Sequence, residues 1–219
     1  MPTDIPSIKY LELTEEHYDG VLKLVLDSFR VDEPINQMRN LTVEQSKDAF
    51  VDLTKAAIQD CISYVAVDQS NGAVAGCRLN TAHNRSETST NSEPKAKYSE
   101  VMEDTFEFLA YLEGDKWKQL PDAKKIFKFE LVSVDGKYRR MGIAQRLIEI
   151  SIQRAKQEGF DYVTTTATSY KTQQLFSEKL GFETLNTVAL KDYKSSRGEH
   201  IFAAAPENNL LGMFMVKKL

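Results

Sequence analysis

The sequence predicts an α/β fold in which a mixed, mostly antiparallel sheet of about seven strands is flanked by helices. Short runs of β-branched and aromatic residues, typical of strands, alternate along the chain with longer runs whose apolar residues recur every three or four positions. The dipeptide Asn71-Gly72 between two apolar runs indicates a β-hairpin. The 219 residues fit one domain over residues 1–219, with an insertion at about 81–122 between the third and fourth strands.

The N-terminal part predicts a strand, two helices and a hairpin. A strand is expected over residues 8–13 and a helix over 15–30, with Thr14 as its N-cap. Pro34 forces the preceding residue away from helical geometry and separates this helix from a second one over residues 41–60, which Thr42 can cap. Strands over residues 61–68 and 73–79 then form the hairpin around Asn71-Gly72.

The remaining chain predicts four more strands and three more helices. Residues 81–97 are polar and predict a surface loop, and residues 98–112 predict a helix within the insertion. Strands are expected over residues 126–134, 162–166, 182–190 and 210–216. Helices are expected from residue 143 to Gly159 and from residue 171 to Gly181, since glycine commonly ends a helix.

Composition narrows the class of protein. Hydrophobic residues make up 42% and charged residues 27%, as in ordinary globular proteins, and the net charge of −4 argues against a nucleic-acid partner. No run of eighteen apolar residues and no apolar leader is present, so we expect no membrane span and a cytoplasmic location. Cys61 and Cys77 lack metal-ligand spacing and are expected to be reduced thiols.

A strand, a turn and a helix meet around residues 129–159, and this arrangement indicates an anion site. The first N–H groups of a helix have no intrahelical partner and lie at its positive end. Gly142 and Ala144 leave room for a ligand there, and Arg139 and Arg140 add positive charge. The alternative is an ordinary amphipathic helix, because Gly and Arg are common at helix starts. The spacing is neither that of a P-loop nor that of a Rossmann site.

The pattern Arg139-x-x-Gly142-x-Ala144 after a β-strand resembles the acetyl-CoA signature of the GCN5-related N-acetyltransferases, the GNAT superfamily. A second segment, residues 175–182 (LFSEKLGF), resembles a late segment of that family. The resemblance implies the GNAT fold, acetyl-CoA as acyl-donor cosubstrate and no metal. It also implies cofactor contacts: the pantetheine arm would lie along Leu131, Val132, Ser133 and Val134, and the pyrophosphate would bind the backbone of Arg139, Arg140, Met141, Gly142, Ile143 and Ala144.

Glu33 is the candidate general base. Acetyl transfer needs a neutral amine, whereas an alkylammonium has a pKa of roughly 10.4, so a base or a route to water must remove a proton. The segment Asp32-Glu33-Pro34-Ile35-Asn36 resembles one in the insect-type arylalkylamine N-acetyltransferases, in which the glutamate is the catalytic base. The alternative for Glu33 is a solvated loop acid, because most Asp and Glu side chains are exposed.

Hydroxyl groups near the start of the late helix are further candidates. The insect-type enzymes have two serines there, four residues apart, and Thr168 and Thr172 match that spacing best. These groups would orient the amine or protonate the thiolate, although Ser169 and Thr172 are equally suited to capping a helix. Many family members have a tyrosine acid in this helix. Phe176 stands at the closest match, and Tyr170 is the candidate substitute.

The resemblance therefore implies acetyl transfer from acetyl-CoA to a small primary amine, most readily an arylalkylamine such as dopamine, serotonin, octopamine or tryptamine. Two alternatives stay open: acetylation of polyamines, amino acids or a protein N-terminus, and a GNAT module that binds acyl-CoA without turnover. The expected partners are acetyl-CoA and the amine, with no nucleic acid or membrane, in a monomer or homodimer.

Overall fold

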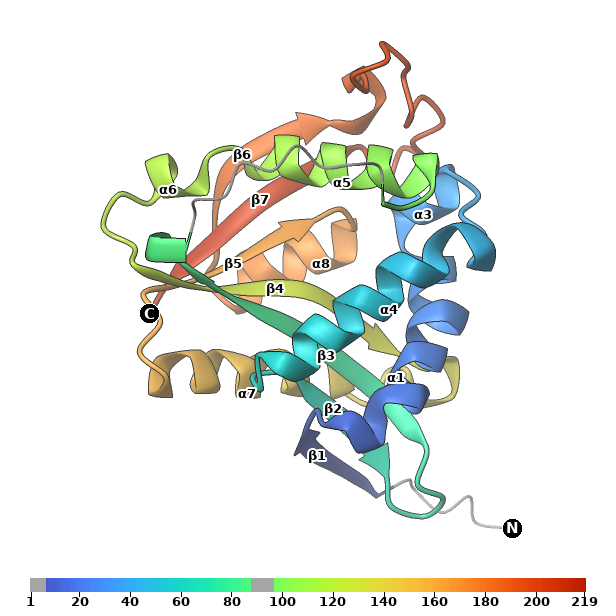
Figure 1. Ribbon diagram of the computed structural model, residues 1–219, viewed down its shortest axis with the longest axis vertical. Coiled ribbons are helices and arrows are strands. Elements are labelled where there is room, and N and C mark those ends of the chain that lie inside the picture. The colour runs from blue at the N-terminus through green and yellow to red at the C-terminus, as the bar shows by residue number, and fades with distance from the viewer. Residues whose placement is uncertain (1–6, 88–96) are drawn as a thin grey trace.

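The computed structural model describes residues 7–87 and 97–219, and its centre is a seven-stranded sheet with strand order β1-β2-β3-β4-β5-β7-β6 (Figure 1). The strands β4 and β5 are parallel, and every other neighbouring pair is antiparallel. The strands are β1 (Ile8–Glu12), β2 (Tyr64–Asp68), β3 (Val74–Asn84), β4 (Lys125–Val134), β5 (Tyr162–Ala167), β6 (Glu183–Ala189) and β7 (Leu211–Lys218). The expected mixed sheet is confirmed.

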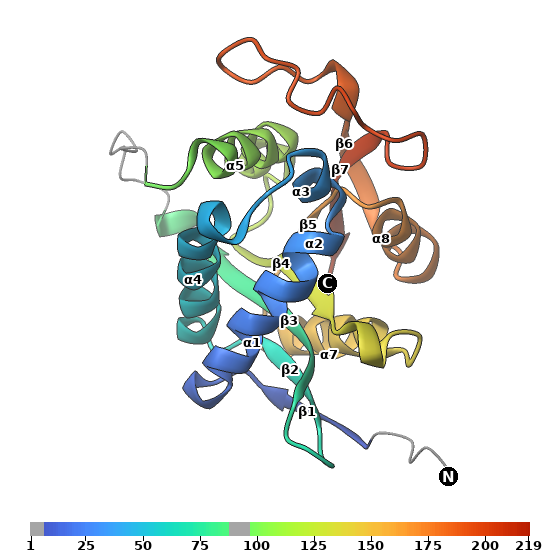
Figure 2. The same cartoon turned by 90° about the vertical axis from the view of Figure 1, so that its right-hand side faces the viewer.

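Helices cover both faces of the sheet, as the edge-on view shows (Figure 2). One face carries α1 (Tyr18–Leu24), α4 (Val43–Gln59) and α5 (Glu100–Glu113). The other carries α7 (Ile143–Gln157) and α8 (Tyr170–Gln174). Three short helices complete the chain: α2 (Arg30–Asp32), α3 (Pro34–Met38) and α6 (Lys116–Gln119). None of the helices in the described segments is both long and apolar enough to cross a membrane.

Local sequence explains the helices beside the site. Thr42 caps α4 with a reciprocal pair of hydrogen bonds to Gln45, and Phe50 and Ala57 on its inner face are buried. The helix α7 buries Ile143, Leu147, Ile148, Ser151 and Ala155, one face of a 3.6-residue period. In the hairpin, Gly72 has φ +73°, a conformation that favours glycine.

Several elements differ from the sequence-based expectations. The strand β3 continues to Asn84, so residues 81–84, expected in a loop, pair with β4. Residues 88–96 of that expected loop lie outside the described residues. Pro34 ends one helix and also begins α3 as its first residue, where its missing N–H is harmless. The short α6 was not expected, and both helices next to the site contain π-helical segments, Val25–Phe29 and Leu175–Lys179.

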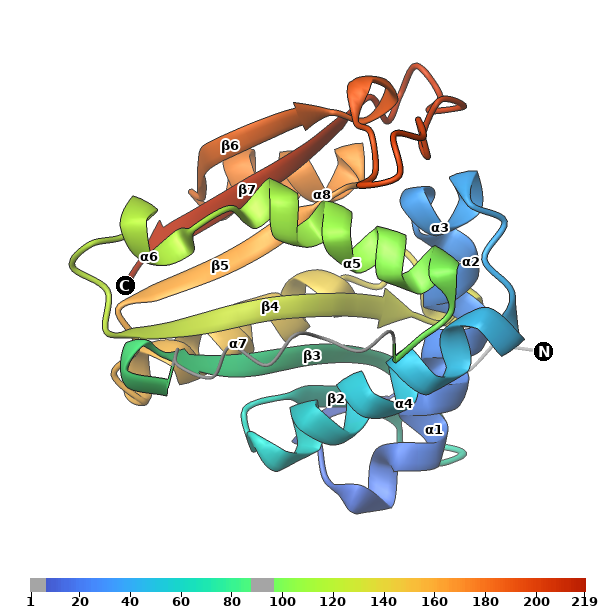
Figure 3. The same ribbon diagram turned by 45° about the horizontal axis from the view of Figure 1, so that its top comes forward.

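The strands β4 and β5 separate halfway along their length, and this opens the sheet (Figures 1 and 3). They pair only from Ile126–Phe129 and Tyr162–Thr165, while both continue further. Glu130 is an extra residue in β4, because Leu79 pairs with Leu131 and Asn80 with Phe129. Beyond this bulge β4 stays beside β3, and its other edge faces the gap.

Candidate active site

A groove of about 470 Å³ leads into the gap between β4 and β5. The end of β4 forms one wall through Val132, Ser133 and Val134, and Arg139 and Ala144 lie at the start of α7. Residues 169–172 at the start of α8 form the facing wall. Five of the predicted cosubstrate residues therefore line one groove, namely Val132, Ser133, Val134, Arg139 and Ala144, and Leu131 lines the adjoining cavity.

The start of α7 can hold an anion. Gly142 is the N-cap with φ +75°, and a Cβ placed on it would meet nothing within 4 Å, so the position is open toward a ligand. The first bond of the helix runs from the Arg146 N–H to the Gly142 carbonyl, which leaves the N–H groups of the preceding turn without a helical partner. Arg140 and Met141 are exposed beside it, whereas the side chain of Ile143 is buried in the core.

The backbone of β4 can bind the pantetheine arm. The Asp135 N–H donates to the Ala75 carbonyl of β3 at 3.0 Å. Because backbone groups alternate along an antiparallel strand, the N–H groups of Val132 and Val134 point away from β3, toward the gap. This edge offers hydrogen-bond donors to an amide or a thioester carbonyl.

Glu33 lies where α2 ends and α3 begins. Its N–H donates to the Phe29 carbonyl at 2.9 Å, and φ −69° with ψ 122° places it as the N-cap of α3. The carboxylate accepts hydrogen bonds from the Thr168 hydroxyl at 2.5 Å and from the backbone N–H of Ile35. Burial raises the pKa of Glu33 above its usual value, and these two hydrogen bonds partly oppose the rise. A half-buried carboxylate of raised pKa is suited to accept a proton near neutral pH.

The three predicted catalytic residues with hydroxyl groups, Thr168, Thr172 and Tyr170, lie around Glu33. Thr168 is buried and directly follows β5, so it reaches Glu33 across the gap. Thr172 lines both the groove and the adjoining cavity. Tyr170 lines the groove, is 52% exposed, and donates its backbone N–H to Asn209. Ser169 is the N-cap of α8 but makes no side-chain capping bond. The structure thus brings Thr168 to Glu33 and leaves Tyr170 at the rim of the groove.

A second cavity, of about 380 Å³, lies on the α4 and α5 side of the gap. It shares Phe29, Glu33, Val132, Ser169 and Thr172 with the groove, so the two spaces adjoin at Glu33. Much of its wall is apolar and aromatic, from Phe50, Leu53, Met102, Phe106 and Leu109. Asn36 also lines it, and its buried Nδ2 has no hydrogen-bond partner among the described residues. A small molecule with an apolar body and one reactive polar end fits this space.

The side chain of Arg139 forms an ion pair with Asp32. Its guanidinium donates to the carboxylate of Asp32, and both side chains are about half exposed. This pair connects the start of α7 to the residue before Glu33. The predicted contact of Arg139 with phosphate stays a prediction.

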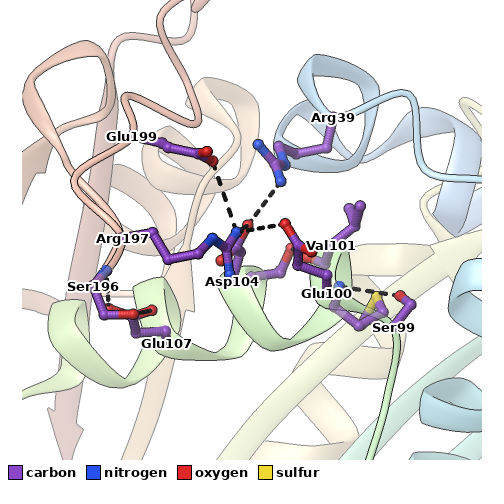
Figure 4. A network of polar contacts seen from close by, with 11 residues as sticks. Arg39, Ser99, Glu100, Val101, Asp104, Glu107, Ser196, Arg197 and Glu199 are labelled. Atoms are coloured by element: carbon purple, nitrogen blue, oxygen red, sulfur yellow. Dashed lines mark hydrogen bonds and ion pairs between the residues drawn. The ribbon is translucent and has the colours of Figure 1, made fainter. Parts of the chain in front are cut away.

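An ionic cluster fixes α5, the wall of the cavity, to two other segments (Figure 4). The carboxylate of Asp104 on α5 accepts from Arg39 at the end of α3 at 2.8 Å and from Arg197 in the β6–β7 connection at 2.6 Å. Ser196 adds hydrogen bonds to Glu107, one turn further along α5. The cluster therefore holds α3, whose N-cap is Glu33, against the cavity wall.

Sequence reasoning missed three charged residues of the cavity wall, Asp52, Arg78 and Glu130. Arg78 is 2% exposed in a strand that otherwise buries small and apolar residues such as Cys77 and Leu79. A basic residue within such a run was the available signal, since buried arginines are rare without a partner. Glu130 gave no signal, because a bulge is not visible in the spacing.

Comparison with known proteins identifies the class. The family described as acetyltransferase (GNAT) domain matches residues 80–195. The fold also matches the crystal structure of arylalkylamine N-acetyltransferase 2 from Aedes aegypti, with 28% identity, TM-score 0.84, and coverage of 97% of this chain and 99% of that one. Two further structures match 97% of this chain and 100% of their own chains, and they show the fold alone. They are mosquito arylalkylamine N-acetyltransferase like 5b (21% identity, TM-score 0.81) and the Drosophila melanogaster polyamine N-acetyltransferase (15% identity, TM-score 0.77).

The chain belongs to the GNAT acetyltransferase family. It is an N-acetyltransferase of the kind that takes an acetyl group from acetyl-CoA and passes it to an acceptor. The groove along β4 and the open glycine at the start of α7 fit the cosubstrate of this family. No cluster of metal-ligating side chains occurs within residues 7–87 and 97–219.

Proposed function

We propose that the protein acetylates the primary amine of a small arylalkylamine, with Glu33 as the general base. The main support for this proposal is the position of Glu33, whose pKa is raised, at the point where the groove and the largely apolar cavity adjoin. A 28% identical arylalkylamine N-acetyltransferase with the same fold supports this choice of substrate class.

The proposed reaction uses residues on both sides of the gap. The ammonium gives a proton to the carboxylate of Glu33, and the neutral nitrogen attacks the thioester carbon. The N–H groups of β4 stabilise the oxyanion. The C–S bond then breaks, the nitrogen releases its second proton to water as the amide forms, and the CoA thiolate takes up a proton, for which Thr172 and Tyr170 are the candidate donors. The donor hydroxyl is then reprotonated from water. Thr168 positions Glu33, because its hydroxyl donates to the carboxylate.

Other carboxylates in the cavity wall bear on the polyamine alternative. Asp52 forms an ion pair with Lys97 at 2.5 Å and accepts from Tyr98 at 2.9 Å. Glu130 accepts from Thr81 at 2.6 Å. Since Lys97 pairs with Asp52 and Lys128 lies 3.7 Å from Glu130, neither carboxylate offers an unpaired negative charge to the second ammonium of a diamine, and an aryl group fits the apolar wall better.

The test is release of CoA thiol from acetyl-CoA with arylalkylamines, diamines, amino acids and a peptide N-terminus. We expect turnover of arylalkylamines, and a fall in kcat/KM of about 10²–10⁴-fold for Glu33→Gln near pH 7. The loss should shrink at high pH, where more of the amine is already neutral. The matched control is Glu178→Gln, which changes an exposed carboxylate in the helical segment that continues α8.

Three results would contradict parts of the proposal. Unchanged turnover in Glu33→Gln removes Glu33 as the base. Turnover of diamines or amino acids alone removes the arylalkylamine. If no amine is acetylated while acetyl-CoA still raises the melting temperature, the chain is a binding module.

A further inference from the structure

The turn that leads into α7, residues 139–142, has an unusual backbone. Arg140 has φ +67° and Gly142 has φ +75°, so two residues of the turn are left-handed and only one of them is a glycine. A non-glycine residue in this conformation costs free energy and persists only where surrounding contacts determine it. The side chain of Arg140 is exposed, so the contacts that hold the turn lie elsewhere.

This backbone is suited to an anion. Turns that contain left-handed residues bring successive N–H groups together in a concavity that binds phosphate groups. The N–H groups of residues 139–142 donate to no backbone carbonyl within residues 7–87 and 97–219. The affinity for the pyrophosphate of acetyl-CoA therefore depends on how firmly the turn is held in this shape before the ligand binds.

Both ends of the turn are anchored in the core. Tyr138, directly before the turn, is 7% exposed, and Ile143, directly after it, is 2% exposed. The two side chains share a hydrophobic cluster with Ala66 of β2, Ala75 of β3 and Leu147 of α7. Hydrophobic burial is not directional, whereas a hydrogen bond at one of these anchors is.

The hydroxyl of Tyr138 makes such a bond. It donates to Oδ2 of Asp68 at 2.9 Å, and Asp68, the last residue of β2, is 3% exposed. Ser70 donates its hydroxyl at 2.7 Å and its N–H at 2.9 Å to the other oxygen of Asp68. The bonds from Ser70, and after them the bond from Tyr138, hold the pKa of Asp68 below its usual value, so the acceptor is charged at neutral pH.

Asp68 is a fixed part of the β2–β3 hairpin, 70 positions before Tyr138 in the chain. Its N–H donates to the Ala73 carbonyl at 2.9 Å, and its carbonyl accepts from the Gly72 N–H at 2.8 Å. The hairpin therefore holds the carboxylate that receives the Tyr138 hydroxyl. Tyr138 is not among the residues that line the groove, so an effect of this bond on the cosubstrate has to pass through the turn.

We propose that the hydrogen bond from Tyr138 to Asp68 positions residues 139–142 for the pyrophosphate of acetyl-CoA, which makes Tyr138 a positioning residue for the cosubstrate. The inference rests on the proposed function, because it assumes that acetyl-CoA binds with its pyrophosphate at the start of α7. Without the bond, the free protein leaves the strained shape of the turn more often, and binding has to restore it. The affinity for a ligand with a pyrophosphate then falls, whereas the affinity for a ligand without one does not.

The experiment uses Tyr138→Phe, which keeps the ring and removes only the hydroxyl. Calorimetry should show that the variant binds acetyl-CoA at least about 5-fold more weakly than wild type. With phenethylamine as the amine, the ratio of kcat/KM for acetyl-CoA to that for S-acetylpantetheine, which lacks the pyrophosphate, should fall by a similar factor. The kcat at saturating acetyl-CoA should not change. A general loss of folded protein lowers both values of kcat/KM and leaves their ratio unchanged.

The matched control is Tyr162→Phe. Tyr162 also donates its hydroxyl to an aspartate, Asp122, at 2.9 Å, and it is 8% exposed. It is the first residue of β5, at the end of that strand remote from the gap. Each variant loses one tyrosine–aspartate hydrogen bond, so we expect similar losses of Tm, but only Tyr138→Phe should change the affinity for acetyl-CoA. Ser70→Ala, which loosens the hairpin and leaves Oδ2 of Asp68 to Tyr138, should change this affinity less than Tyr138→Phe does.

Three results would overturn the proposal. The first is an affinity for acetyl-CoA in Tyr138→Phe equal to that of wild type. The second is an equal loss of affinity in Tyr162→Phe, because the bond would then act through overall stability. The third is a wild type that does not discriminate between acetyl-CoA and S-acetylpantetheine, because the turn would then not bind the pyrophosphate.

Folding and the proposed function are tested separately. If Tyr138→Phe does not fold, Asp68→Asn replaces it, because the amide keeps the shape and is a weaker acceptor for the Tyr138 hydroxyl, and the same loss of affinity is expected. If wild type acetylates no arylalkylamine, the proposed function fails. The calorimetric comparison of wild type, Tyr138→Phe and Tyr162→Phe needs no turnover, and it then decides the role of Tyr138 alone.

Discussion

Asp104 connects three segments around the cavity, and we predict that Asp104→Asn destabilises the fold and weakens amine binding. The carboxylate is 1% exposed and accepts from both Arg39 and Arg197 (Figure 4). Asparagine keeps the shape but removes the charge, and it turns an amide N–H₂ or a weaker acceptor toward the two guanidinium groups.

The Arg39–Asp104 pair and the Arg197–Asp104 pair contribute unequally to the free energy of unfolding. Arg39 is 17% exposed at its side chain and pairs with Asp104, so this charge-assisted hydrogen bond contributes about 1.5–3 kcal/mol. Arg197 is 40% exposed and keeps Glu100 at 2.9 Å, so solvent screens this pair and it contributes the smaller share of the stability. The neutral amide is also easier to bury than the carboxylate, which offsets part of the loss. We therefore expect a loss of about 2–3 kcal/mol, or roughly 4–12 °C in Tm for a domain of this size.

The assay combines unfolding and kinetics. Urea and thermal unfolding give the stability of wild type, Asp104→Asn and the control Arg197→Met, which removes only the exposed half. The KM for the amine should rise in Asp104→Asn, because α3 and the wall of α5 separate, whereas the affinity for acetyl-CoA at α7 should not change. Equal losses of stability in the two variants, or a loss below about 0.5 kcal/mol in Asp104→Asn, would refute the reasoning.

Two further predictions concern the groove and the base. Gly142→Ala should weaken acetyl-CoA binding about 10-fold or more and cost roughly 1–2 kcal/mol of stability, since φ is +75°. The matched control is Gly72→Ala, at φ +73° in the hairpin, which should cost similar stability and leave the affinity for acetyl-CoA, measured by calorimetry, unchanged. If the two variants bind acetyl-CoA with equal affinity, Gly142 has no role in binding it. The raised pKa of Glu33 means that the folded state holds this proton more tightly than the unfolded state, so wild-type stability is lost as pH rises from the usual 4.5 through the raised value. The variant Glu33→Gln has no such loss, so its Tm relative to that of wild type should rise from pH 4 to pH 8. A fall in this relative Tm over the same range would show that burial does not dominate at Glu33.

The parts of the site that depend on local sequence were predictable. Gly142 at a helix start after a strand indicates an anion site from the backbone alone, and the structure places it in the left-handed conformation at the N-cap of α7. The capping of α4 by Thr42 and the turn at Asn71-Gly72 follow from residue types that act on their near neighbours. Each of these features is contained within a few residues of chain.

The contact between Glu33 and Thr168 could not be derived in the same way. The two residues are 135 positions apart, and only the family resemblance suggested that both take part in the reaction. The π-helical segments Val25–Phe29 and Leu175–Lys179 lie on either side of this contact and each shifts the turn by a residue. Apolar spacing predicts a regular helix through both segments, so it misplaces the side chains that reach the gap.

The bulge at Glu130 explains why the sequence pattern did not predict a charged residue in the cavity wall. An extra residue reverses the alternation of β4, so Phe129 packs with the core beneath α7 and α8, while Leu131 packs beneath α1 and α4. The reversal occurs where β5 departs from β4, and it leaves Glu130 in the wall of the cavity. A buried arginine is tolerated there because the ring of Phe129 lies against it. The groove and the cavity therefore have one structural cause, the separation of two parallel strands at a bulge.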